Sequence, residues 1–300
     1  MPNAGLGNKL FVWAKAHIFA SINNLPLLVT GWTRLQKAAL LHGGDLRLYL
    51  NYFKRIDQIG WQARFLALRA QVVSEPAVAR VPVSSSGVVY EFSEVPSWMD
   101  YFRDIRAFRD HVREGLLNML TPTRQKELAT ARPAIVCANV RLGDFRRLAA
   151  NESFNAVGGV RTPLEYFRSL ILNIREVHGS TLPVEIVTDG RRSEVSELLN
   201  LPSVSMAPKR SKIVDILMMS SSRILISSAG STFSYWAGFL GECVFIHHPD
   251  HVHKLIRAED VNCKSYEGPL EGSPVSWPSL VLANVRNIPC HSNHHAHDIP

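Results

Sequence analysis

Residues 134–140, AIVCANV, form a short apolar run rich in β-branched residues, and the polar stretch RLGDF follows directly at 141–145. Three more runs of this kind lie farther along the chain, PVEIVTD (183–189), RILISS (223–228) and ECVFIHH (242–248). Apolar residues recur at helical spacing between and after them, over 163–178, 192–200, 212–222 and 232–241. Short buried strands that alternate with helices predict an open parallel sheet of the Rossmann type.

The chain before residue 121 carries the same alternation in a weaker form. Apolar residues recur at helical spacing over 8–24, and the strand-like run PLLVTG follows at 26–31. A second strand-like run, VVYEF (88–92), precedes a helical pattern over 98–120. We therefore expect βα units in this part of the chain as well.

The composition changes at TPTRQKELATARP (121–133), which we take as a domain boundary. The prediction is an α/β protein with two Rossmann-like domains that face a cleft. The N-terminal domain would span 1–130, on the expected acceptor side, and the nucleotide-binding domain 131–272. The periodicity fades after about residue 250, and residues 273–300 are expected to form a tail.

Composition and charge favour a folded protein with an anionic ligand. Of the 300 residues, 46% are hydrophobic and 20% are charged, which excludes a disordered chain. The 33 Lys and Arg residues outnumber the 26 Asp and Glu residues and give a net charge of +7. Because the basic residues are dispersed and no nucleic-acid-binding motif appears, we expect no nucleic-acid partner.

The sequence contains no membrane or export signal. No stretch approaches the roughly 18 apolar residues of a membrane-spanning helix, and the first residues, MPNAGLGNKLF, lack the pattern of a signal peptide. The expectation is a cytoplasmic protein without a membrane span, for which peripheral membrane association stays open. The four cysteines have no CxxC spacing, which predicts reduced structural thiols.

Two segments near the predicted strand ends carry residues that suit an anion. Gly5, Gly7 and Asn8 lie just before the first helix, where glycines allow close approach of a ligand; the alternative is a tight turn with Asn8 as the N-cap. Arg141 could clamp a diphosphate through two parallel hydrogen bonds. The alternative there is a surface ion pair with Asp144, three residues on.

A third segment, Ser231, Thr232 and Phe233, joins a strand to a helix and could seat a phosphate. The alternative is an ordinary N-cap followed by core residues. Asp189 also ends a predicted strand and is a candidate residue of the nucleotide-sugar site; the alternative is a turn-forming aspartate. The histidines of 247–253 follow a strand and could line the cleft, whereas those of 290–298 are expected in an exposed tail, and neither run predicts a catalytic metal.

Three elements together resemble glycosyltransferase family 11, the α-1,2-fucosyltransferases, and the related protein O-fucosyltransferases. They are GLGN at 5–8, NVRLGDF at 139–145 and ISSAGSTFSYWAGFLG at 226–241. The resemblance implies a two-domain enzyme of the GT-B type that transfers fucose from GDP-fucose with inversion, without a metal or another cofactor. The partners would be the GDP-sugar donor and a glycan acceptor.

The resemblance also implies a role for each matched residue. Arg141 would contact the β-phosphate and the leaving oxygen, and Ser231, Thr232 and Phe233 would seat the diphosphate. Asp215 would hydrogen-bond the guanine, and Asn8 would face the donor sugar or the acceptor.

Four features depart from the family pattern. Asn139 stands where the family has a histidine and offers an amide for a sugar hydroxyl or a phosphate, and Leu142 replaces the second arginine of the HxRRGDY motif. Lys9 replaces a glutamine, and we expect it to be solvated. Only residues 1–4 precede the glycine turn, where the family has a full strand, so either the start is late or that strand is truncated.

The predicted function is fucose transfer to a hydroxyl of a glycan or polysaccharide precursor, most simply a galactoside. Asp144 is the candidate general base by its location, with a structural turn role as the alternative. Two alternatives remain for the whole protein: a transferase for another GDP-sugar, and a sugar-nucleotide-binding protein with impaired catalysis.

Overall fold

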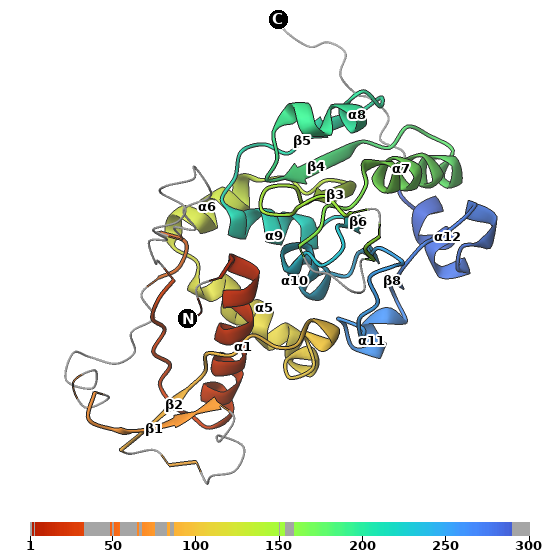
Figure 1. Ribbon diagram of the computed structural model, residues 1–300. Coiled ribbons are helices and arrows are strands. Elements are labelled where there is room, and N and C mark those ends of the chain that lie inside the picture. Colours follow the sequence, from red (N-terminus) through yellow and green to blue (C-terminus); the bar gives the residue numbers. More distant parts are fainter. Residues whose placement is uncertain are drawn as a thin grey trace, which may run out of the picture.

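A parallel sheet forms the centre of the C-terminal part of the chain (Figure 1). The computed structural model describes residues 2, 4–32, 49, 51–54, 65, 68–75, 83–84, 87–149, 151–153 and 159–289. Within these residues the sheet has the strand order β5-β4-β3-β6-β7-β8, and every neighbouring pair is parallel. Its strands are β3 (Val136–Val140), β4 (Val184–Thr188), β5 (Val204–Met206), β6 (Ile224–Ser227), β7 (Val244–Ile246) and β8 (Glu267–Gly268). The four strands predicted after residue 133 are confirmed.

The strand order reverses between β3 and β6. The chain enters the sheet at β3, adds β4 and β5 on one side, and then crosses over to add β6, β7 and β8 on the other. Asn139 of β3 lies in register with Ser227 of β6. At such a reversal the loops that follow the two strands diverge, which leaves room for a ligand at their carboxyl ends.

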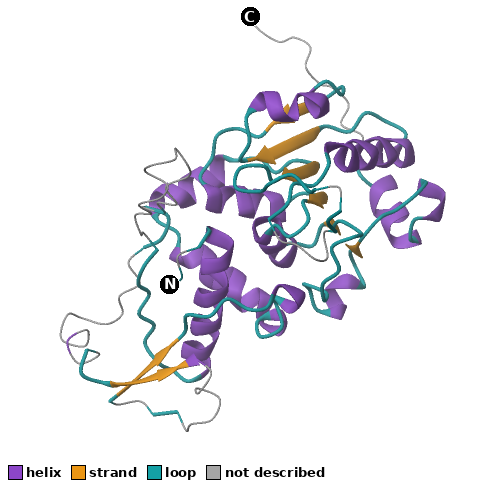
Figure 2. Ribbon diagram, in the orientation of Figure 1, coloured by secondary structure: helices purple, strands orange, loops and turns teal. Residues whose placement is uncertain are grey.

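Side chains of the strands alternate between two hydrophobic cores, as the pleat of a strand requires. One core joins Cys137, Leu225 and Phe245 to helices α1 (Leu6–Ile22), α9 (Lys212–Ser220) and α10 (Thr232–Leu240). The other joins Val136 and Ile224 to helices α7 (Leu164–His178) and α12 (Ser279–Arg286). Helices therefore cover both faces of the sheet, and the protein is α/β with a Rossmann-like sheet (Figure 2).

The helices of the C-terminal part follow the predicted periodicity. The patterns at 163–178, 212–222 and 232–241 are α7, α9 and α10, whereas 192–200 divides into a 3₁₀ turn, η3 (Arg192–Val195), and α8 (Ser196–Leu199). The shorter elements beyond β7 are α11 (Glu259–Asn262) and η4 (Pro274–Ser276). Helix α12 lies in the segment assigned to the tail and buries Val281 and Val285 in the second core. The terminal histidine run, 290–298, lies outside the described residues.

The N-terminal part contributes one long helix, a small sheet and a run of short helices. The helix predicted over 8–24 is α1, and VVYEF contains β2 (Val88–Glu91), which pairs in parallel with β1 (Gln71–Ser74). The pattern over 98–120 divides into η1 (Trp98–Asp100), η2 (Arg106–Phe108) and α5 (Arg109–Met119), and α6 (Pro122–Thr130) follows.

The strand predicted at PLLVTG (26–31) is wrong, because these residues have no regular structure. Pro26 has no N–H to donate to a ladder. At the other end of the run, the Gly31 carbonyl accepts a hydrogen bond from a lysine side chain instead of a strand neighbour.

Aromatic contacts join α1 to α10. The rings of Phe11 and Trp236 lie 4.9 Å apart, and Phe102, from the turn after η1, packs between the two helices, 4.9 Å from Phe11 and 4.7 Å from Phe239. Trp236 also donates its indole N–H to the Gly7 carbonyl over 2.8 Å. The first turns of α1 and α10 are therefore held against each other.

The expectation of a solvated Lys9 is wrong. Lys9 is only 2% exposed, and its ammonium group donates to the carbonyls of Gly31 and Trp32, both over 2.9 Å. The same ammonium lies 5.3 Å from the centre of the Tyr49 ring. Lys9 thus binds the segment after α1 to the start of that helix.

We expect Lys9→Met to lower the free energy of unfolding by about 2–4 kcal/mol, because two part-buried carbonyls lose the charged donor that a buried ammonium provides. Lys126→Met on the exposed face of α6 is the control, with an expected change within about 0.5 kcal/mol. Urea unfolding followed by circular dichroism measures both. Equal stability of the two variants would contradict a structural role for Lys9.

Candidate functional site

Hydrogen bonds join the ends of β3 and β6, where the strand order reverses. The Ser228 hydroxyl donates to the Asn139 carbonyl and accepts from the Arg141 N–H, each over 2.9 Å. Ser228 also donates its own N–H to the Asn139 carbonyl over 3.1 Å. The start of the Arg141 loop is therefore fixed to the end of β6.

Asn139 is almost fully buried at this point, with 3% of its surface exposed. Its amide Nδ2 donates to the Val187 carbonyl over 3.3 Å, and its Oδ1 accepts from the Ser231 hydroxyl over 3.0 Å. The amide that the sequence offers to a ligand is thus engaged within the protein. In this arrangement Asn139 positions Ser231 rather than presenting a free polar group.

The Arg141 guanidinium lies between two carboxylates. Its Nη2 is 2.7 Å from Asp144 Oδ1, and its Nη1 is 2.6 Å from Asp189 Oδ2. The side chains of Arg141 and Asp144 are 27% and 47% exposed. The ion pair weighed as an alternative is present, and Asp189 joins it from the end of β4.

Asp189 also fixes the backbone of the Arg141 loop. Its Oδ1 accepts from the N–H groups of Leu142 and Gly143, over 2.8 and 3.0 Å. A Cβ at Gly143 would stand 2.5 Å from Asp189 Oδ2, so any other residue there would displace this carboxylate. Asp189 therefore orients both the guanidinium and the loop that carries it.

The N-terminus of α10 has no side-chain cap. Ser231 is the N-cap residue, but its hydroxyl donates to Asn139 and accepts no first-turn N–H. Thr232 and Phe233 occupy the first two helical positions, and the first turn contains no acidic residue. The N–H groups of a first turn lack acceptors within the helix, so this end favours an anion.

The N-terminus of α1 meets α10 at the same place. Gly5 is its N-cap residue, without a side-chain cap, and its first turn also lacks acidic residues. A Cβ on Gly7 would stand 2.6 Å from Thr232 Oγ1, so the two helices touch through this glycine. Asn8 lies within the first turn rather than at the cap, and its buried Oδ1 has no hydrogen-bond donor among the described residues. The positive ends of both helix dipoles therefore converge beside the Arg141 loop.

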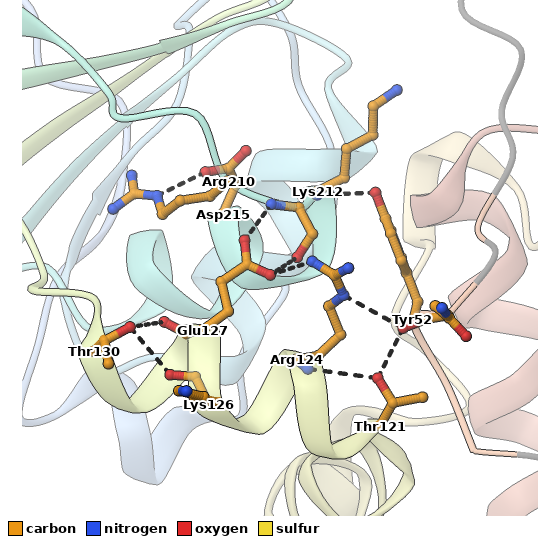
Figure 3. A network of polar contacts seen from close by, with 11 residues as sticks. Tyr52, Thr121, Arg124, Lys126, Glu127, Thr130, Arg210, Lys212 and Asp215 are labelled. Atoms are coloured by element: carbon orange, nitrogen blue, oxygen red, sulfur yellow. Dashed lines mark hydrogen bonds and ion pairs between the residues drawn. The ribbon is translucent and has the colours of Figure 1, made fainter.

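Asp215 belongs to a second polar network, between α6, α9 and β4 (Figure 3). Its Oδ1 accepts from Arg210 Nε over 3.0 Å, and Arg210 also pairs with Glu185. Burial raises the pKa of Asp215 to about 6, although Arg210 favours its charged form. No contact between described residues links Asp215 directly to Arg141.

The Asp215 network also connects the two parts of the chain. Glu127 of α6 accepts from the Ser211 N–H and hydroxyl, and the Lys212 N–H donates to Tyr52 Oη over 3.2 Å (Figure 3). The sequence predicted a guanine contact for Asp215 but did not indicate Arg210 or Glu185. Their pairing crosses from a loop to a strand, a contact that spacing does not reveal.

Four histidines form a cluster beside β7 and α10, which we call the histidine cluster; His247, His248 and His251 are buried, and His253 is partly buried. Burial lowers the pKa of each, to about 3 for His247 and about 4 for His251. The rings of His247 and His253 lie 4.6 Å apart. Within the described residues, no group of three or more His, Cys, Asp or Glu side chains could hold a metal ion.

A separate cavity of about 650 Å³ lies in the N-terminal part. One wall is the middle of α1, including Trp13 and Phe19, and the others are residues 25–30 and the β1–β2 sheet. The walls are mostly apolar, with Arg69 and Glu91 among the polar residues. The cavity does not include the Arg141 loop or the start of α10.

Comparisons with known proteins give structural likenesses at low sequence identity. No protein-family model matches the chain, and no curated protein matches it. The fold is similar to that of NodZ alpha-1,6-fucosyltransferase soaked with GDP-fucose, with 13% identity, 84% of this chain and 94% of that chain covered, and a TM-score of 0.49. The apo form of POFUT1 aligns with 10% identity, coverage of 79% and 91%, and a TM-score of 0.39. An arginine-to-lysine mutant of Arabidopsis thaliana FUT1 in complex with GDP aligns with 11% identity, coverage of 85% and 71%, and a TM-score of 0.39.

None of the described helices is both long and apolar enough to cross a membrane.

Proposed function

We propose that the protein is a metal-independent, inverting glycosyltransferase that moves fucose from GDP-fucose to a hydroxyl of a glycan or polysaccharide precursor. The observation that carries this proposal is the convergence of two uncapped helix N-termini, those of α1 and α10, beside Arg141. First-turn N–H groups and a guanidinium together favour a ligand with several negative charges. A nucleotide diphosphate is such a ligand, and Rossmann-type sheets bind nucleotides at this edge.

In the transfer, the bond between the sugar carbon and the β-phosphate oxygen breaks while the acceptor oxygen attacks from the opposite face. Negative charge develops on the departing phosphate, where Arg141 and the first-turn N–H groups of α10 would stabilise it. Asp144 is the more exposed partner of Arg141 and can turn away as the phosphate takes its place. Asp189 is held by two N–H groups and would keep the guanidinium oriented.

Two residues are proposed to act on the acceptor side of the reaction. Asp144, once released from Arg141, would accept the proton of the acceptor hydroxyl as the general base. Asn8 adds, at the first turn of α1, an amide oxygen that accepts no hydrogen bond from the described part of the chain, which suits a sugar hydroxyl.

We infer the donor sugar and the linkage from the sequence motifs. The sequence motifs support fucose, GDP and a galactoside acceptor with an α-1,2 linkage, and another GDP-sugar is the alternative donor. Recognition of guanine by Asp215 would require Arg210 to yield one carboxylate oxygen, because guanine offers two adjacent donors. This requirement makes nucleotide selectivity the decisive measurement.

We expect GDP to raise the thermal midpoint by several degrees, and more than ADP, UDP or GMP does. A ligand that binds only the folded state adds about 2.7 kcal/mol at a hundredfold excess over its Kd. GMP lacks the β-phosphate that would contact Arg141, and ADP and UDP lack the donor edge of guanine. Differential scanning fluorimetry measures all four, and equal shifts with GDP and UDP would contradict a GDP-sugar donor.

Hydrolysis and transfer assays with GDP-fucose and GDP-mannose then identify the sugar. They are run with a chelator present, because the proposal needs no metal. Turnover of GDP-fucose supports the full proposal. Preferential turnover of GDP-mannose would mean that the donor sugar is mannose rather than fucose. A GDP-induced shift without any turnover would identify a sugar-nucleotide-binding protein instead.

A further inference from the structure

One histidine of the cluster faces the start of α10. Nε2 of His251 lies 3.2 Å from the position that a Cβ of Gly230 would occupy, and Gly230 is two residues before the first residue of α10. His251 is 7% exposed, and its buried Nδ1 has no hydrogen-bond partner among the described residues. A buried ring nitrogen without a partner is costly, and a ring that carries one and faces the start of α10 points to a ligand there.

The local structure fixes the direction of this ring. Trp98 contacts it edge-on at 5.4 Å between ring centres, and the Tyr235 ring lies 6.2 Å away on α10. Gly230 adopts a left-handed backbone with φ of 68° and donates its N–H to Tyr235 Oη. Since Gly230 has no side chain, the His251 ring can lie close to the backbone just before α10.

His251 is neutral in the free protein because of its burial and its titratable neighbours. Burial is the main cause that lowers its pKa to about 4, and His253 and His248 lower it further. Tyr235 is neutral because burial raises its pKa, and Asp100 of η1 and Glu267 of β8 act on His253. No carboxylate is a direct partner of His251 among the described residues, so an incoming anion would be the dominant nearby negative charge.

We propose that His251 binds the diphosphate of the nucleotide and takes up one proton from solvent as it does so. The proposal rests on the proposed function, because the same seat must hold a nucleotide diphosphate. No covalent bond forms or breaks: a buffer acid or water gives the proton, and the imidazolium returns it when the nucleotide leaves. Nucleotide binding would therefore strengthen as the pH falls toward the pKa that His251 has in the free protein. The affinity would rise by at most about tenfold per pH unit for one proton.

Isothermal titration with GDP between about pH 8 and about pH 6 tests the proposal on the full chain. The native protein should gain several-fold more affinity over this range than His251→Gln, in which only the titration of GDP itself remains. His178→Gln, at the end of α7, is the matched control and should follow the native profile. His251→Phe retains a ring of similar shape and serves where the glutamine variant does not fold.

Titrations in two buffers of different ionisation enthalpy count the protons directly. Uptake by the native protein and its loss in the His251 variants support the proposal, whereas equal pH profiles and proton counts overturn it. Inorganic pyrophosphate is the second probe. If pyrophosphate shows His251-dependent uptake while GDP does not bind, the proton coupling stands and the nucleotide assignment fails; if neither binds, both fail.

Discussion

Arg141→Lys is expected to lose nearly as much turnover as Arg141→Ala, roughly 10²–10³-fold in kcat. The guanidinium contacts Asp144 and Asp189 through two different nitrogens, a geometry that also fits two oxygens of a phosphate. An ammonium is a single point of charge and cannot span the same positions. Turnover of GDP-fucose at saturating donor measures the loss, because the interaction proposed for Arg141 strengthens as the phosphate departs.

Arg147 provides the matched control on the same loop, since it is exposed and forms no ion pair among the described residues. Arg147→Lys and Arg147→Ala should retain turnover close to that of the native protein. The turnover of Asp189→Asn should lie between those of the Arg141 and Arg147 variants. Its amide oxygen still accepts from the Leu142 and Gly143 N–H groups but no longer pairs with Arg141 as a charge. Near-normal turnover in Arg141→Lys would remove Arg141 from the proposed role.

The regular part of the fold is predictable from the sequence because its strands are apolar and its helices amphipathic. A run such as AIVCANV has no polar face, and only a strand covered on both sides buries it all. Strands β5 (VSM) and β8 (EG) lack this signal, because β5 is only partly buried with a polar residue at its centre and β8 has two residues, neither of them apolar and branched. The run at 26–31 has the apolar pattern of a strand but does not form one, since Pro26 lacks an N–H and the Gly31 carbonyl accepts from Lys9.

The location of the candidate site is also predictable, whereas its internal contacts are not. Arg141 and Asp189 end neighbouring strands, so their proximity follows from the sheet. Contacts between distant residues decide the rest: Ser231 bonds to Asn139 across 92 positions and so leaves the start of α10 uncapped. Sequence spacing cannot show such a pairing, because it depends on how the helices pack on the sheet.

The same limit applies to the glycines of GLGN, which look equivalent in the sequence. Gly5 faces open space, and nothing lies within 4 Å of a Cβ placed there. A Cβ on Gly7 would meet Thr232 at 2.6 Å from Oγ1 and 3.1 Å from the backbone carbonyl carbon. Rotation of the threonine side chain relieves the first contact but not the second, so only Gly7 sets the approach of α1 to α10.

Gly7→Ala should therefore push the two helix N-termini apart, while Gly5→Ala should leave them in place. Overpacking costs about 1–3 kcal/mol, partly offset by the better helix propensity of alanine. The effect on activity should be larger, since a displacement of about 1 Å at a reacting site can cost about 10²-fold. We expect Gly7→Ala to lose GDP-fucose turnover by roughly that factor with a smaller GDP-induced thermal shift, and Gly5→Ala to stay near the native values, because its φ of −64° suits any residue. Equal turnover in the two variants would mean that the contact between α1 and α10 does not shape the phosphate site.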